Sequence, residues 1–179
     1  MIATDNDLAR LRSRSELMLS CVRLALRNAI AWRKAGGLAP TQADFITLAR
    51  TRLQQSQDFL TAPAPDHRRM TSQVEGTARR VFASRLTKRL LTIAPRQYIA
   101  SAGESPDALL RDRNGRLHAV LLSSETTPLN MGLAAVAVAR RVLLENLSFG
   151  VTVHVLSTDT GKHHTFLYND HLHELPTAV

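Results

Sequence analysis

The feature that most constrains the fold is a change in hydrophobic periodicity close to Pro95. Before Pro95, apolar residues recur three and four positions apart, which predicts amphipathic helices. After it, short apolar runs are separated by turn-forming residues, a pattern typical of β-strands. The chain is therefore expected to combine a helical first part with an α/β second part.

The first part predicts three helices. One spans 5–35 and ends at a pair of glycines, and a second runs from a capping pair, Thr41 and Asp44, to about residue 60. We expect these two to form an antiparallel hairpin, with a helix-turn-helix as the alternative. Residues 61–70 hold two prolines and predict a connector, after which a third helix is expected over 72–93.

The second part predicts strands around one further helix. The strands are expected at 96–101, 105–112, 116–124, 151–157 and 163–168. The dipeptide Asn114-Gly115 is a strong hairpin signal between the second and third strands. The helix at 128–147 is apolar nearly all round, so we expect it to be buried. Strands joined by tight turns and then by a helical crossover indicate a mixed sheet with helices on its faces.

The predicted domain organisation follows from this order. We expect a helical hairpin extension over 1–62, an α/β core over 71–170 and a tail over 171–179. A chain of 179 residues is long enough for one such domain with an extension.

The charge of the chain is uneven along its length. The net charge is +8, and residues 1–96 hold 17 basic and 7 acidic side chains. A basic half of this kind predicts a polyanionic partner, for which we expect duplex DNA. The candidate backbone-binding residues lie on the third helix: Arg79, Arg80, Arg85, Lys88 and Arg89. Aromatic residues make up only 4% of the chain, which argues against a base-stacking single-strand module.

The sequence also excludes or disfavours a disulfide-bonded protein, a membrane-spanning protein and a secreted protein. Cys21 is the only cysteine, so an intramolecular disulfide is excluded, and its apolar surroundings indicate a packing role. No apolar run reaches the length of about 20 residues that crosses a bilayer. The start of the chain carries acids instead of the basic segment of a signal peptide. We therefore expect a cytoplasmic protein without membrane contact.

The segment 105–124 carries a family resemblance. Pro106-Asp107 opens one strand of the predicted hairpin, and the apolar strand after Asn114-Gly115 forms the other. This segment resembles the core hairpin of the PD-(D/E)xK nuclease superfamily, which has the restriction-endonuclease-like fold. In that family the element order is αβββαβ, as predicted here. The resemblance implies two carboxylates that hold Mg²⁺ and a lysine that orients the attacking water.

The family motif maps onto this chain only in part. Asp107 matches the hairpin aspartate and Glu75 resembles the glutamate of the preceding helix, but the Glu-x-Lys positions are Leu121 and Ser123. Glu125, farther along the same strand face, is the residue that would complete a site. The implied catalytic set is Glu75, Asp107, Ser123 and Glu125, with Asp107 and Glu125 as ligands of Mg²⁺ in an active enzyme.

These departures set the functional expectation. We expect a DNA-binding protein with a degenerate nuclease-like fold that acts in a DNA-processing, defence or mobile-element assembly. One alternative is an active magnesium-dependent endonuclease. The other is a protein-interaction module whose partners bind the helices at 5–35 and 41–60.

Histidines gather toward the end of the chain, where His163, His164, His171 and His173 follow His154. Such a group has the ligand type that transition metals prefer. Adjacent histidines on a strand point to opposite faces, however, so we do not expect these side chains to form a metal site.

Overall fold

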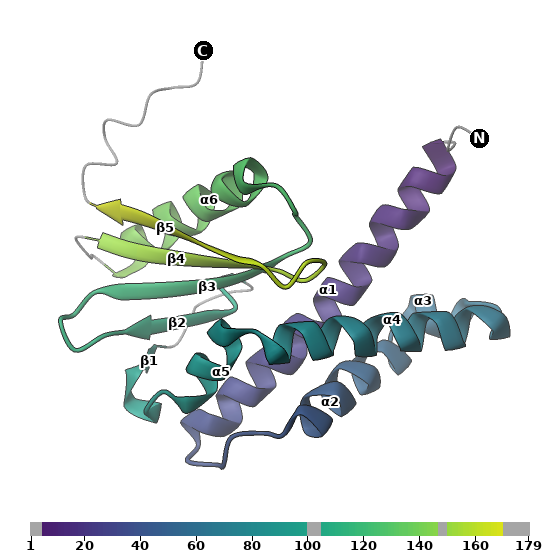
Figure 1. Ribbon diagram of the computed structural model, residues 1–179, viewed down its shortest axis with the longest axis horizontal. Helices are drawn as coiled ribbons and strands as arrows, with labels where there is room; N and C mark the ends of the chain where they lie inside the picture. The colour runs from purple at the N-terminus through teal and green to yellow at the C-terminus, as the bar shows by residue number, and fades with distance from the viewer. Residues whose placement is uncertain (1–4, 100–104, 147–149, 170–179) are drawn as a thin grey trace.

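The computed structural model describes residues 5–99, 105–146 and 150–169. These ranges form six α-helices, one 3₁₀ helix and five strands, and Figure 1 shows how the labelled helices and strands are arranged. In chain order they are α1 (Asp5–Lys34), α2 (Gln42–Gln54), α3 (Gln57–Thr61), α4 (Ala64–Ala83), α5 (Arg85–Thr92), η1 (Pro95–Gln97), β1 (Tyr98–Ile99), β2 (Ala108–Arg111), β3 (Leu117–Ser123), α6 (Pro128–Asn146), β4 (Gly150–Ser157) and β5 (His163–Asn169).

The strands form one mixed sheet in the order β1-β2-β3-β4-β5. Neighbouring strands are antiparallel, except that β3 and β4 are parallel and are connected through α6. The register pairs Ala108 with Val120 and Leu121 with Val155. The expected α/β class, a mixed sheet flanked by helices, is therefore confirmed.

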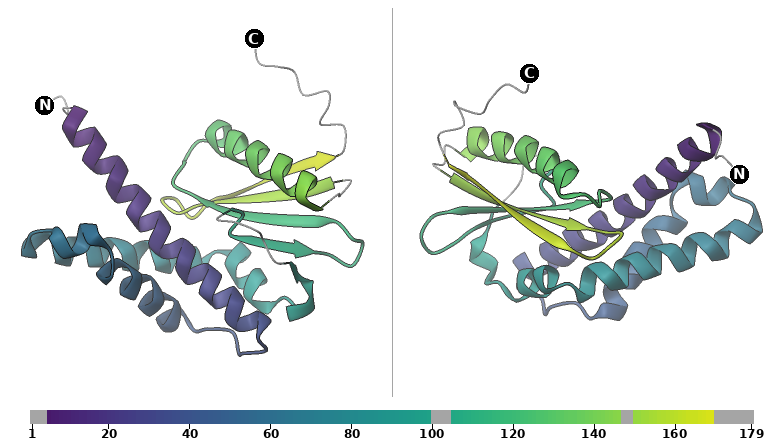
Figure 2. Two further views of the ribbon diagram at one scale, coloured as in Figure 1. Left: turned by 180° about the vertical axis from the view of Figure 1, so that it is seen from behind. Right: turned by 45° about the horizontal axis from the view of Figure 1, so that its top comes forward.

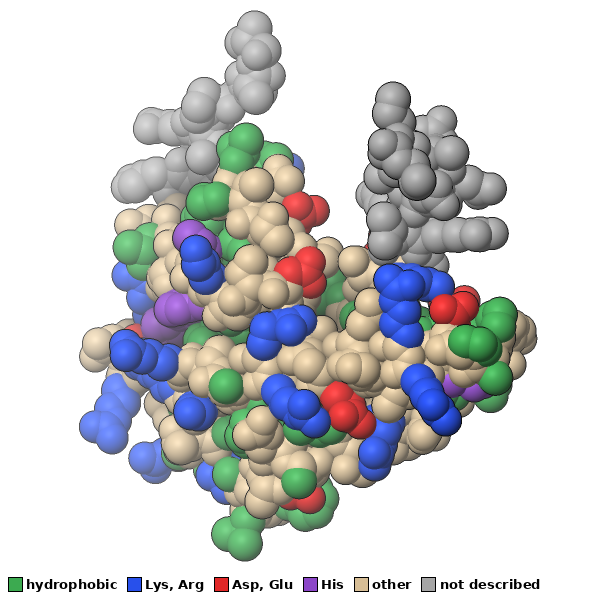
Figure 3. Space-filling model, turned by 45° about the vertical axis from the view of Figure 1, so that its right-hand side comes forward, with side chains coloured by type: hydrophobic (Ala, Val, Ile, Leu, Met, Phe, Trp, Pro, Cys, Tyr) green, Lys and Arg blue, Asp and Glu red, His purple; other side chains and the backbone are tan. Residues whose placement is uncertain are grey.

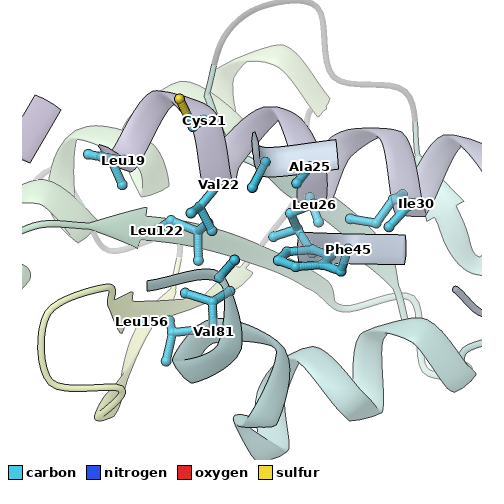
Figure 4. Packing of buried hydrophobic residues seen from close by; sticks show 14 of the residues in the cluster. Leu19, Cys21, Val22, Ala25, Leu26, Ile30, Phe45, Val81, Leu122 and Leu156 are labelled. Carbon is cyan, nitrogen blue, oxygen red and sulfur yellow. The ribbon is translucent and has the colours of Figure 1, made fainter. Parts of the chain in front are cut away.

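The helices cover the two faces of the sheet as separate layers (Figure 2). On one face, side chains of α1, α2, α4 and α5 share a hydrophobic cluster with Val120, Leu122 and Leu156 of the sheet. On the other face, α6 packs on a second cluster that includes Leu121 and Val153. Figure 4 shows the first cluster, in which side chains of α1 point toward β3. Residues from both predicted domains, 1–62 and 71–170, thus contribute to the first cluster.

Sequence signals place the ends of the first two helices. The predicted capping pair is confirmed, because Thr41 caps α2 through the backbone N–H of Asp44 and the Asp44 carboxylate accepts from the Thr41 N–H. The second helix is shorter than expected, since Ser56 caps a separate helix, α3. Cys21 is fully buried in α1, as expected for a packing residue, and burial raises the pKa of its thiol.

The predicted connector over 61–70 is wrong. Helix α4 already begins at Ala64, and Met70 is buried in the core. The prolines do not interrupt this helix because Pro63 is its N-cap and Pro65 lies in its first turn, where the backbone N–H has no intrahelical partner.

The prediction of a single helix over 72–93 is also wrong, because the helix is interrupted at Ser84. The Ser84 backbone is extended, and its hydroxyl accepts a hydrogen bond from the N–H of Thr87 at 3.1 Å. Ser84 thereby ends α4 and caps α5. The apolar spacing continues through the break, which is why periodicity alone did not reveal it.

The predicted hairpin turn is confirmed between β2 and β3. Asp112 Oδ1 accepts from the N–H groups of Asn114 and Arg116, both at 2.9 Å. Gly115 has φ +81°, a conformation that glycine adopts without a steric penalty. The first predicted strand begins later, at Tyr98, because Pro95–Gln97 form η1. Its predicted end at residues 100 and 101 and the predicted tail lie outside the described residues.

Helix α6 is not buried all round, which corrects the expectation. One side packs on the sheet, but Leu129, Leu133 and Leu144 are 74%, 65% and 71% exposed. Of the helices that the structure describes, none combines the length and the apolarity needed to cross a membrane.

Candidate functional site

Asp107 lies just before β2, with its carboxylate fully buried against α1. Arg27 Nη2 donates to Oδ1 at 3.2 Å, and Arg23 Nε lies 3.4 Å from Oδ2. The backbone N–H of Leu122 donates to Oδ2 at 2.7 Å. Burial raises the pKa of Asp107, and the two arginines and the Leu122 N–H hold that rise back. Both carboxylate oxygens are thus engaged by groups of the protein itself.

The same contacts tie α1 to the centre of the sheet. Arg23 and Arg27 are one helical turn apart, so both guanidinium groups reach the same carboxylate. Arg23 Nη2 also donates to the carbonyl of Leu122 at 2.6 Å. Asp107 and Arg23 therefore satisfy both backbone groups of Leu122, which gives this cluster a structural role.

The positions that correspond to Glu-x-Lys do not face Asp107. Leu121 belongs to the cluster beneath α6, whereas Asp107 points to α1 on the opposite side of the sheet. Ser123 is buried, and its hydroxyl accepts from the N–H of Glu125 at 3.1 Å. These side chains cannot complete a site around the Asp107 carboxylate.

The two other predicted acids also have partners elsewhere. Glu75 forms ion pairs with Arg50 of α2 at 3.6 Å and with Arg79 at 3.3 Å. Glu125 is exposed and accepts from the amide of Asn130 at 2.9 Å. Glu75 and Arg79 lie four residues apart on α4, so their ion pair is an ordinary helix-stabilising contact that requires no catalytic role for this glutamate.

A magnesium ion does not fit this donor set. In the described ranges, no three His, Cys, Asp or Glu side chains are close enough together to hold a metal ion. The structure thus does not gather Glu75, Asp107 and Glu125 into one site, and a metal at Asp107 would have to displace two guanidinium groups.

The predicted DNA-binding residues divide into two sets. Arg79 is paired with Glu75, and Arg80 Nε donates to the carbonyl of Thr158 at 3.2 Å. The other three, Arg85, Lys88 and Arg89, are exposed on α5 and form no ion pair with any described residue. Their spacing of three and four residues places them on one side of this short helix.

Further arginines extend this surface beyond the prediction. Arg89 and Arg111 line one cavity, and a second, adjoining hollow is lined by Arg111, Arg96 and Arg113. None of these four has a carboxylate partner in the described part of the chain. We call the whole set the α5 basic surface: Arg85, Lys88, Arg89, Arg96, Arg111 and Arg113. Figure 3 shows basic side chains beside histidines at its left edge.

A row of hydrogen-bonded side chains crosses three strands next to this surface. His118 contacts Asp112 Oδ2 at 3.3 Å and His154 at 3.2 Å, and Thr165 contacts His154 at 3.3 Å and His163 at 3.1 Å. One set of neutral tautomers satisfies every contact, with each N–H or O–H donating toward Asp112. The row was not predicted, because its members come from strands that are far apart in sequence.

The electrostatics of the row follow from its surroundings. Burial lowers the pKa of His154 to about 4, and His118, His163 and Arg89 add to this effect. Slight burial raises the pKa of Asp112, but hydrogen bonds from His118 and from the Arg116 and Asn114 N–H groups leave it below its ordinary value. His154 is therefore neutral at pH 7, and Asp112 is an anion whose oxygens accept hydrogen bonds from His118 and from the Asn114 and Arg116 N–H groups.

Comparison with protein-family models, with curated proteins and with solved structures finds no match to this chain. The functional argument therefore depends on the residues themselves.

Proposed function

We propose that this protein binds the phosphate backbone of duplex DNA through the α5 basic surface, and that it does not cleave DNA at the Asp107 position. The observation that carries this proposal is the set of six cations without a carboxylate partner among the described residues. By contrast, arginines elsewhere in the described chain pair with Asp107, Glu75 and Asp66.

The arrangement of these cations suits a polyanion. They come from α5, from η1, from the end of β2 and from the turn after it, and two adjoining hollows join Arg89, Arg96, Arg111 and Arg113. Guanidinium groups bind phosphate oxygens through paired N–H donors. Backbone contacts of this kind give affinity without sequence preference.

The resemblance to the PD-(D/E)xK superfamily supports a DNA partner and a degenerate site. From α5 onward the element order is helix, three strands, helix and strand, followed by β5. The pairing of Asp107 with Arg23 and Arg27 supports loss of the metal-binding role. An assembly that processes DNA or defends against mobile elements is the setting we propose for such a protein.

The test is fluorescence anisotropy with a labelled duplex over a series of salt concentrations. If four or five phosphates are contacted, log K should fall with log salt at a slope of about −4. The double variant Arg89→Ala/Arg111→Ala should weaken binding and make the slope less steep by about 2. The control is Arg140→Ala, an exposed arginine on α6 across the sheet, which should leave binding unchanged.

Two results would overturn the proposal. Absence of binding at low salt would remove the DNA partner and leave the protein-interaction module through residues 5–35 and 41–60. Cleavage that requires Mg²⁺ and is lost in Asp107→Ala would instead establish the endonuclease.

A further inference from the structure

A cavity of about 190 Å³ opens on the α5 basic surface, between α5 and the sheet. Its lining combines aliphatic, hydrogen-bonding and cationic side chains: Leu86, Arg89, Leu90, Ile93, Gln97, Leu110, Arg111, Asp112, His118, Val120 and His154. The cavity is smaller than the roughly 300–1,000 Å³ of sites that take drug-sized ligands. Its size suits one nucleobase-sized ring and excludes a dinucleotide.

The walls of the cavity are aliphatic. Leu86, Leu90 and Ile93 line it from the α5 side, and Leu110 and Val120 line it from the sheet. Leu90 and Val120 are almost fully buried in the first hydrophobic cluster, so the lining offers one apolar floor, on which one face of an aromatic ring can be removed from water.

The lining leaves one polar side chain available to the edge of such a ring, that of Gln97. His118 and His154 are held in fixed orientations by the hydrogen-bonded row, since each ring nitrogen has a partner within it. The side-chain amide of Gln97 has no hydrogen bond within the described residues, so both its donor and its acceptor are available. An amide that both donates and accepts matches the edge of a nucleobase.

Cations complete the cavity. Arg89 and Arg111 line it from opposite sides, one from α5 and the other from β2. The only acid in the lining, Asp112, is occupied by His118 and by backbone N–H groups. The net charge is therefore positive where a phosphate joined to the bound ring would lie.

We propose that this cavity binds one nucleoside monophosphate unit, with one face of the base on the aliphatic floor and the phosphate on Arg89 and Arg111. The unit can be a free nucleotide or an unpaired nucleotide at the end of a DNA strand. In the second case the inference depends on the proposed function, because it adds recognition of a strand end to backbone binding.

The test compares a blunt duplex with the same duplex carrying one unpaired 5′-phosphorylated nucleotide. Anisotropy should show about tenfold tighter binding of the second duplex, the size of effect that burying one base gives. Ile93→Trp, which fills the cavity, should abolish this preference and retain binding to the blunt duplex. The matched control is Thr92→Trp, because Thr92 is an exposed neighbour outside the lining.

A second variant keeps the test decisive if the tryptophan disturbs folding. Gln97→Ala removes the available amide and little buried surface, so it should reduce the preference while the far-ultraviolet circular dichroism stays unchanged. In a separate arm, thermal unfolding without DNA is followed with millimolar nucleoside 5′-monophosphates. Stabilisation of the wild type but not of Ile93→Trp would identify free nucleotides as ligands.

The outcomes separate this inference from the proposed function. Equal binding of both duplexes, with no stabilisation by free nucleotides, overturns the nucleotide cavity and leaves backbone binding intact. Failure to bind either duplex overturns the proposed function, and the thermal arm then decides on the cavity by itself.

Discussion

Replacing Asp107 with asparagine tests whether this residue is structural or catalytic. The substitution keeps an acceptor for the Leu122 N–H but removes the charge that Arg23 and Arg27 share. If the cluster is structural, the variant should be clearly less stable than the wild type. A residue kept for catalysis at the expense of stability should give a variant that is equally or more stable.

The expected loss follows from the distances. At 3.2 and 3.4 Å each ion pair has a Coulomb energy of about 5 kcal/mol with an effective dielectric constant of 20. Desolvation of the buried carboxylate offsets several kcal/mol, and water screens the two guanidinium groups, which are about one-third exposed. We therefore expect the free energy of unfolding to fall by about 2–3 kcal/mol.

Urea unfolding at pH 7, followed by circular dichroism at 222 nm, measures this loss. With a slope of about 2 kcal/mol/M, the midpoint should fall by about 1–1.5 M without a change in slope. The matched control is Asp66→Asn, since Asp66 and Arg14 form an ion pair at 3.6 Å in which both side chains are about one-third exposed, and the loss should be below about 1 kcal/mol. A midpoint for Asp107→Asn at or above that of the wild type would refute the structural role.

Two further perturbations test the description of the fold. Ser84→Ala removes the hydroxyl that caps α5 through the Thr87 N–H and should lower the free energy of unfolding in urea by about 1 kcal/mol; an unchanged midpoint would contradict this. His154 has a pKa lowered to about 4, so the unfolded chain binds a proton more readily than the folded one. Stability should therefore be full above about pH 6.5 and should fall by about 2 kcal/mol toward pH 4, after allowance for partial exposure of the ring. Thermal unfolding at pH 7, 5.5 and 4.5 measures this, and the same decline in His154→Gln would show that another group is responsible.

Local signals in the sequence predicted most of the elements. The capping pair at Thr41 and the dipeptide Asn114-Gly115 depend only on neighbouring residues, and both were correctly located. The break at Ser84 is also local, since the serine lies three residues before Thr87, but the apolar spacing that continues through it hid the signal. Pro63 and Pro65 led to the wrong prediction of a connector, because in the sequence a proline at the start of a helix looks the same as a proline in a connector.

The site was predictable only where its residues lie close together in the chain. Arg85, Lys88 and Arg89 were predicted on a basic helix face, and the structure places them exposed on α5. Arg111 and Arg113, close to the Asn114-Gly115 turn, were not predicted. The pairing of Asp107 with α1 and the contact of His118 with His154 arise from packing across the sheet. Neither periodicity nor a motif encodes such contacts, so only the folded structure shows them.

The position of Asp107 has a consequence for folding during synthesis. Arg27 is 80 residues ahead of its carboxylate partner in the chain. At about 5–20 residues per second, Arg27 leaves the ribosome roughly 4–16 s before Asp107 does. During that interval two cations and an apolar helix face have no sheet to pack against. The nascent helices of the first half are thus the segment on which a chaperone has the longest time to act.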